Sequence, residues 1–236
     1  MRERSAHSLF FAPALCYNIR IVNGAFPDVA GREAFALSAS TREQILITAR
    51  RLFNELGYDR VPMRRLADEL GIGVGNVTYY FARKQDIVAA LMDDRFMQIQ
   101  LPQTYASPEA LTQLLSQMLD TLTCNAFFFL DPEFAGDERH AAHHGQLRAC
   151  LLSSLEQMTQ AGLFLPSFTP EVRETLLTLL LMTHTTWLRQ TMRAPSPAMS
   201  KAALLRAHWL ALSPYLSDAG REAYAKIKDR PPLAEA

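Results

Sequence analysis

The 236-residue sequence has few cysteines, no excess of either charge and no long apolar run. Its three cysteines, Cys16, Cys124 and Cys150, are scattered and form no Cys-x-x-Cys pair, which argues against a disulfide framework or a thiolate zinc site. Lysine and arginine total 24, as do aspartate and glutamate, so any nucleic-acid site has to be local. We expect a protein of the reducing cytoplasm.

Membrane and catalytic signatures are also missing. The most apolar segment, Leu176–Met182, is followed at once by polar residues, and the run from Leu9 to Leu15 contains Pro13 and lacks the length of a secretory signal. The sequence contains no Gly-x-Ser-x-Gly motif, phosphate-binding loop or dinucleotide fingerprint after a strand. We therefore expect a soluble chain that is not an enzyme and uses neither a cofactor nor a membrane.

Helical periodicity begins at Ser40. Ser40 and Glu43 have the spacing of a capping box, and apolar residues then recur at helical intervals as far as Gly57. Residues 1–39 show no sustained period and are interpreted as an N-terminal extension. Further helices are predicted from Pro62, over Val74–Tyr80, from Lys84 to Pro102, and near 108–130, 137–162, 170–193 and 198–217. Because no segment alternates as a strand does, the chain is predicted to be all-α.

A supporting helix, a glycine-containing turn at Gly71–Gly73 and a second short helix form a helix-turn-helix pattern. Residues 41–84 carry eight basic and five acidic side chains, a small local excess of positive charge where phosphates would bind. The spacing alone is moderate evidence, since this geometry also occurs in proteins that never touch DNA.

Residues 41–91 closely resemble the DNA-binding region of the TetR/AcrR family of bacterial transcriptional regulators. The matching positions are Ala49, Leu52-Phe53, Gly57-Tyr58, Leu66-Ala67, Gly71, Gly75-Asn76-Val77, Tyr79-Tyr80-Phe81 and Lys84. Phe127–Phe129, the helix ending at Ala161-Gly162-Leu163, and Pro214–Leu216 with Gly220-Arg221 look like one subgroup's regulatory domain. The resemblance implies an all-α, TetR-like fold with a helix-turn-helix DNA-binding domain at 40–88, a larger effector-binding and dimerisation domain at 89–230, and a tail at 231–236.

The resemblance also implies which residues contact DNA. Val74–Tyr80 would form the recognition helix, and Arg64 is the best candidate for a bidentate guanine contact. The candidate DNA-binding residues are Arg64, Val74, Gly75, Asn76, Thr78, Tyr79, Tyr80, Arg83 and Lys84. Thr78 replaces a tyrosine usual in the family, and Arg83 stands where the family often has a capping Ser or Thr. Phe81 is predicted to lie in the core.

Apolar residues of the C-terminal helices suggest an effector pocket and a dimer seam, although core packing explains the same pattern. The candidate pocket residues are Met118, Phe127, Phe128, Met182, His184 and Trp187. The helix from Thr175 to Leu188 is apolar almost all round and would form a four-helix bundle with its neighbour and a second copy. The candidate interface residues are Leu177, Leu181, Leu188, Leu205, Trp209 and Leu212. His140, His143 and His144 are interpreted as a solvated patch and not as a metal site.

The sequence thus predicts a sequence-specific, homodimeric transcriptional regulator. The resemblance implies a repressor that a small-molecule effector releases from a palindromic operator in double-stranded DNA. The alternative is a helical adaptor that keeps the helix-turn-helix as a scaffold without DNA recognition. Its support is Thr78, the modest basic excess, and Gly73 and Gly75, which weaken the short helix.

Overall fold

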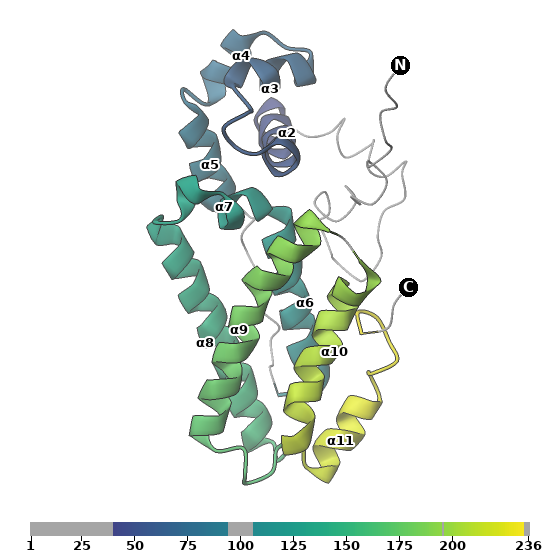
Figure 1. Cartoon of the computed structure of the whole chain (residues 1–236). Coiled ribbons are helices and arrows are strands. Elements are labelled where there is room, and N and C mark those ends of the chain that lie inside the picture. Colours follow the sequence, from purple (N-terminus) through teal and green to yellow (C-terminus); the bar gives the residue numbers. More distant parts are fainter. Residues whose placement is uncertain (1–39, 94–105, 195, 234–236) are drawn as a thin grey trace. The chain divides into compact units, whose positions relative to one another are not determined.

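The computed structural model describes residues 40–93, 106–194 and 196–233, so the extension predicted at 1–39 lies outside the described residues. The chain divides into two compact units, of which the first is described over 40–93 and 124–131 (Figure 1). Among the described residues there is no strand, and a single antiparallel bridge joins Phe164 and Leu216. The predicted all-α class is confirmed.

The first unit begins with a capped helix. α2 (Thr41–Leu56) starts at Ser40, whose hydroxyl accepts the Glu43 N–H at 3.3 Å while the Glu43 carboxylate accepts the Ser40 N–H at 3.1 Å. This reciprocal pair satisfies two N–H groups that the helix itself leaves unpaired. Gly57, with φ of 84°, ends the helix, as the sequence predicted.

Two short helices follow and form the helix-turn-helix. α3 (Met63–Leu70) starts directly after Pro62, which is its N-cap, and Gly71 ends it with a left-handed φ of 65° that glycine adopts at little cost. α4 has the bounds predicted for the recognition helix, Val74–Tyr80. Leu66, Ala67 and Val77 are fully buried and hold the two helices together.

α5 (Lys84–Asp93) starts without a Ser or Thr cap. The Asp86 carboxylate, in the first turn, instead accepts the N–H of Arg83, the residue before the helix, at 2.8 Å. The predicted continuation of this helix towards Pro102 lies outside the described residues. The helical stretch predicted near 108–130 is interrupted, because Asn125 separates α6 (Pro108–Cys124) from α7 (Ala126–Leu130).

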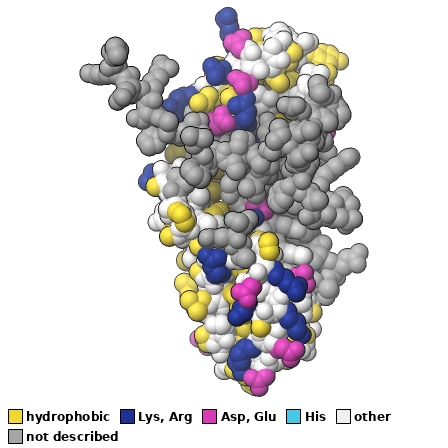
Figure 2. All heavy atoms as spheres, turned by 90° about the vertical axis from the view of Figure 1, so that its right-hand side faces the viewer, with side chains coloured by type: hydrophobic (Ala, Val, Ile, Leu, Met, Phe, Trp, Pro, Cys, Tyr) yellow, Lys and Arg dark blue, Asp and Glu magenta, His cyan; other side chains and the backbone are white. Residues whose placement is uncertain are grey.

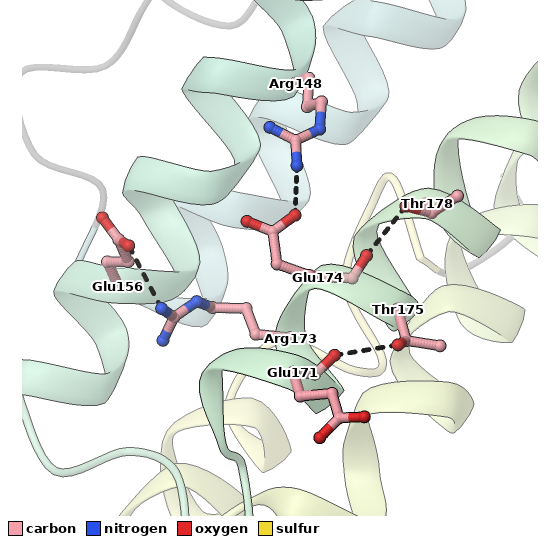
Figure 3. Close-up of polar contacts among 7 residues, drawn as sticks. All are labelled: Arg148, Glu156, Glu171, Arg173, Glu174, Thr175 and Thr178. Atoms are coloured by element: carbon pink, nitrogen blue, oxygen red, sulfur yellow. Dashed lines mark hydrogen bonds and ion pairs between the residues drawn. The ribbon is translucent and has the colours of Figure 1, made fainter.

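The second unit consists of residues 108–123 of α6 and the helices that follow α7. These are α8 (Glu138–Gln160), α9 (Pro170–Arg193), α10 (Lys201–Leu212) and α11 (Asp218–Ala225), with the 3-10 turns η2 (Pro132–Phe134), η3 (Pro197–Met199) and η4 (Ser213–Tyr215). α8 and α9 pack side by side, and two ion pairs, Arg148–Glu174 and Arg173–Glu156, join them (Figure 3).

The helix predicted near 198–217 is shorter than expected, because α10 ends at Leu212 and η4 follows. α11, which the sequence did not predict, then packs closely against an earlier turn. The Ser217 N–H donates to the Leu163 carbonyl at 3.0 Å, and a Cβ at Gly220 would lie 2.1 Å from the same oxygen. Only glycine fits there.

One face of the second unit carries side chains of both charges. Figure 2 shows basic and acidic side chains interspersed over the end of the unit that carries α11. No helix in the described part of the chain is long and apolar enough to cross a membrane.

Candidate nucleic-acid interface

α4 is held by one side chain and exposes the others. Val77 is fully buried, whereas each other residue of the helix is exposed. The exposed fraction reaches 81% for Tyr79 and is 41% for Tyr80, whose rings meet edge to face at 5.1 Å. Large apolar groups left in water mark a surface that a partner covers.

Phe81 lies in the core, as predicted, with only 4% of its surface exposed. It follows the last helical residue in an extended conformation, with φ of −141°, which separates its side chain from the two tyrosines. The Arg42 guanidinium lies 5.3 Å from the centroid of the Phe81 ring. The three consecutive aromatic residues therefore divide between core and surface.

The polar residues of α4 differ in what they leave available. Asn76 is exposed, and nothing lies within 4 Å of a Cβ built at Gly75, so both sites are open to a ligand. The Thr78 hydroxyl lies 3.2 Å from the Val74 carbonyl and 3.1 Å from the Gly75 carbonyl. Its proton is therefore engaged within the helix, although the residue is exposed.

The basic candidates have different surroundings. Arg64, on α3, is exposed and forms no ion pair with any described residue, and the Arg83 side chain is exposed 3.8 Å from Asp86. Lys84 is half-buried: its ammonium donates to the Tyr58 carbonyl at 2.8 Å and lies 3.7 Å from the centroid of the Tyr58 ring. Lys84 thus ties the start of α5 to the turn after α2.

The structure does not bring the candidate effector-pocket residues together in one unit. Phe127 and Phe128 belong to the first unit, where Phe127 packs on Phe53 at 5.2 Å. Met118, His184 and Trp187 are buried in the second unit, and Met182 is 65% exposed there.

Met182 and Trp187 do lie together, in a groove of about 500 Å³ between α9, η3 and α10. The groove is lined by Leu179, Met182, Thr183, Thr186, Trp187, Gln190, Ala198, Met199, Ala203, Leu204 and Ala207. Trp187 is fixed in its wall, because its indole N–H donates to the Met199 carbonyl at 2.7 Å.

His184 forms a buried pair with His208, with ring centroids 5.1 Å apart. Each residue is 2% exposed, and burial lowers the pKa of His184 to about 3 and that of His208 to about 4, so both are neutral at pH 7. The Thr183 hydroxyl is 3.2 Å from Nε2 of His208. Sequence reasoning missed His208, although it shares a helical face with the buried Leu205 and Leu212.

The six candidate interface residues are all buried within their own protomer. Leu181 is 7% exposed and the other five are fully buried; Trp209, for example, donates to the Thr112 hydroxyl at 2.9 Å and stacks on Tyr224. The large apolar side chains that stay exposed on the same two helices are Leu179, Met182 and Leu210.

The predicted histidine patch is only partly solvated. His144 is exposed, but His143 is buried, and burial together with nearby His140 and His144 lowers its pKa to about 4. Within the described ranges no group of three or more His, Cys, Asp or Glu side chains could hold a metal ion.

Comparison with known proteins identifies the first unit. Residues 45–91 match the model of the bacterial regulatory proteins of the tetR family. This segment, which contains the helix-turn-helix, is therefore similar to the tetR family of bacterial regulators. A curated relative, the HTH-type transcriptional repressor Rv1474c of Mycobacterium tuberculosis (strain ATCC 25618 / H37Rv), is 42% identical over 53 residues. That match covers 22% of this chain and 28% of the relative, so it spans little more than a quarter of that protein.

Solved structures extend the likeness in fold to both units. A TetR-family transcriptional regulator from Marinobacter aquaeolei VT8 has a TM-score of 0.64 at 22% identity, covering 81% of this chain and 98% of that one. The SmeT–triclosan complex has a TM-score of 0.59 at 20% identity, covering 77% and 94%; SmeT represses a multidrug efflux pump of Stenotrophomonas maltophilia. The predicted TetR-like fold is confirmed.

Proposed function

We propose that this chain is a cytoplasmic transcriptional repressor of the tetR family that binds a palindromic operator as a homodimer and leaves it when a small molecule binds. The observation that carries the proposal is α4, which keeps two tyrosines in water and a single residue in the core. A curated relative named as a repressor and a solved neighbour in complex with triclosan support the regulatory part.

The DNA contacts follow from the exposed groups around α4. Asn76 can bond both edge atoms of an adenine, and Arg64 both acceptors of a guanine. The hydroxyls of Tyr79 and Tyr80 and the guanidinium of Arg83 supply phosphate contacts, which position the helix without reading sequence. The missing side chain at position 75 lets the backbone of Val74 and Gly75 approach the DNA.

Two candidates have altered roles in this proposal. Thr78 engages its proton within α4, so it presents a methyl group, which suits contact with a thymine methyl. The Lys84 ammonium is held by the carbonyl and the ring of Tyr58. It can therefore contact a phosphate only while it keeps these contacts. The domains of the proposed repressor are those expected from the sequence, 40–88 for DNA and 89–230 for dimer and effector, except that residues 124–131 belong to the first unit.

The dimer in this proposal forms through α9 and α10. Leu179, Met182 and Leu210 expose 53%, 65% and 74% of their surface, and a second copy would remove them from water. In a two-fold dimer the same patch faces itself, and the two α4 helices then enter successive major grooves about 34 Å apart. An effector releases such a dimer from DNA by binding the DNA-free conformation more tightly than the DNA-bound conformation, by roughly 1–3 kcal/mol.

A fluorescence anisotropy titration of the full chain against its own upstream intergenic duplex tests this function. Scrambled duplex serves as competitor, and two salt concentrations reveal phosphate contacts, because affinity falls steeply with salt. We expect Arg64→Ala to weaken specific binding about 5- to 150-fold, the range for one bidentate base contact, and Tyr79→Phe to weaken it less. Lys226→Ala, an exposed charge in the second unit, is the control.

The outcomes separate the two functions considered. Salt-sensitive, sequence-selective binding establishes the regulator, provided that sedimentation shows the variants to be dimers like the parent. If Arg64→Ala and Tyr79→Phe both bind as the parent does, the assigned DNA face is wrong. If a well-folded dimer binds no duplex at either salt concentration, the protein is an adaptor that retains the helix-turn-helix as a scaffold.

A further inference from the structure

Asn54, near the end of α2, bonds to both sides of the break between α6 and α7. Its Nδ2 donates to the Cys124 carbonyl at 2.7 Å, and its Oδ1 accepts the Phe127 N–H at 2.9 Å. The last carbonyls and the first N–H groups of helices have no partner within the helix. One amide thus satisfies the end of α6 and the beginning of α7, and we call these two bonds the Asn54 clamp.

An apolar contact lies beside the clamp. The Phe53 and Phe127 rings are 5.2 Å apart, and Phe53 also meets Tyr58 edge to face at the same centroid distance. Phe53 and Phe127 are 1% and 5% exposed. Since all these residues belong to the first unit, α2 holds the corner formed by Cys124, Asn125 and α7 as part of its own core.

α6 is anchored elsewhere along its length. Its residues 108–123 belong to the second unit, where Thr112 accepts the Trp209 indole N–H at 2.9 Å and Asp120 binds Lys201 at 2.8 Å. A helix bonded along its axis moves as one element. A displacement of α6 by the helices of the second unit is therefore delivered to Cys124.

We propose that Asn54 is the positioning residue through which α6 and the DNA-binding helices move together. α2 packs on α3 and α3 on α4, so a shift of α2 re-aims the exposed face of α4. The coupling itself is argued from these contacts, and only its use in the response to an effector rests on the proposed function. Coupling is reciprocal, so a ligand on α4 must also restrain the end of α6.

Hydrogen exchange measured by mass spectrometry on the full chain tests the clamp with duplex DNA as the ligand. In the parent we expect the operator duplex to slow exchange in α2–α4 and also in peptides covering α6 and α7. In Asn54→Ala the slowing stays in α2–α4 and is lost from α6 and α7. Glu55→Ala changes the next residue of the same helix, which is exposed and pairs with half-buried Arg51, and should behave like the parent.

Asn54→Asp keeps the acceptor for the Phe127 N–H and loses the donor to Cys124. Because aspartate has nearly the volume of asparagine, this variant serves as the test if the alanine variant does not fold. We expect it to transmit part of the slowing. A purely structural asparagine would raise exchange near position 127 in every state and leave the DNA-induced slowing of α6 intact. Slowing of α6 and α7 equal to that of the parent in both variants overturns the proposal.

A second measurement needs no DNA. Leu115→Val loosens a fully buried position of α6 in the second unit and should speed hydrogen exchange there. When Asn54 is present, we expect the faster exchange to spread to α2. In Asn54→Ala it should stay in α6, a non-additivity that a double-mutant cycle detects. If the chain binds no duplex but this cycle is non-additive, the proposed function fails and the coupling stands. An additive cycle overturns the coupling.

Discussion

The buried pair of His184 and His208 should make the second unit acid-sensitive. Burial is the main cause of the lowered pKa of His184, and nearby His208 and His144 lower it further. The neutral form is thus favoured in the folded state, so the stabilisation is complete above the unfolded pKa of about 6.5. It is lost progressively as the pH falls from there towards the folded pKa of about 3.

The magnitude follows from these two values. With an unfolded pKa of about 6.5 and a folded pKa of about 3, going from pH 7 to pH 5 costs His184 about 2 kcal/mol. Against a total stability of about 5–15 kcal/mol this is a large fraction. His184→Leu replaces the ring with an apolar side chain of similar volume, so the variant should lose about 2 kcal/mol less than the parent over that interval.

Urea unfolding at pH 7, 6 and 5, followed by tryptophan fluorescence, measures this loss. Both tryptophans, Trp187 and Trp209, lie in the second unit with the histidine pair, so the signal reports that unit. His144→Gln, at an exposed position, is the control and should keep most of the pH dependence of the parent. Equal losses for His184→Leu and the parent would refute the reasoning, since His184 would then take up its proton in the folded state at no cost.

Two further pairs of variants, one at Phe81 and Tyr79 and one at Gly220 and Gly75, test the packing that the structure describes. Phe81→Ala should cost about 3–5 kcal/mol because it empties a core position, whereas Tyr79→Ala should change stability by no more than about 0.5 kcal/mol; urea unfolding followed by circular dichroism measures both. Gly220→Ala should destabilise by about 1–3 kcal/mol or more, since its Cβ would meet the Leu163 carbonyl at 2.1 Å. Gly75→Ala meets nothing within 4 Å and should stabilise α4 by about 1 kcal/mol, so thermal melts should move in opposite directions.

Elements whose ends are encoded locally were predictable. Ser40 and Glu43 form the predicted capping box, Gly57 ends α2, and Gly71 ends α3 with a positive φ. These signals depend on a few neighbouring residues, so the sequence contains them in readable form. The bounds of α4 followed from the family resemblance, which implied a recognition helix over the same residues, Val74–Tyr80.

Elements fixed by distant contacts were not predictable. Asn125 interrupts an apolar helical pattern, and the groups freed by the break are satisfied by Asn54, 70 residues from Cys124 along the chain. No local signal at 124–127 reveals that partner. α11 was missed for a similar reason, because its position depends on the approach of Gly220 to Leu163.

The dimer residues illustrate the same limit. Periodicity marks Leu205 and Trp209 as apolar but cannot say which element covers them, and the structure covers Trp209 with Thr112 and Tyr224 of the same protomer. Other large apolar side chains of these helices, such as Leu210, stay exposed. An apolar pattern predicts that side chains are buried, but only the fold decides whether residues of the same chain or of another chain cover them.

Among the described residues, large hydrophobic side chains are exposed in two places, on α4 and on the outer faces of α9 and α10. Each exposed apolar group costs about 25 cal/mol per Å² that burial would recover, so folding alone does not favour these positions. The α4 set carries tyrosine hydroxyls and lies beside exposed arginines, which suits a charged, hydrogen-bonding partner such as DNA. The set on α9 and α10 consists of Leu179, Met182 and Leu210, which suits a second apolar surface. The different chemistry of the two sets is therefore the physical reason for proposing DNA as the partner of one and a second copy of the chain as the partner of the other.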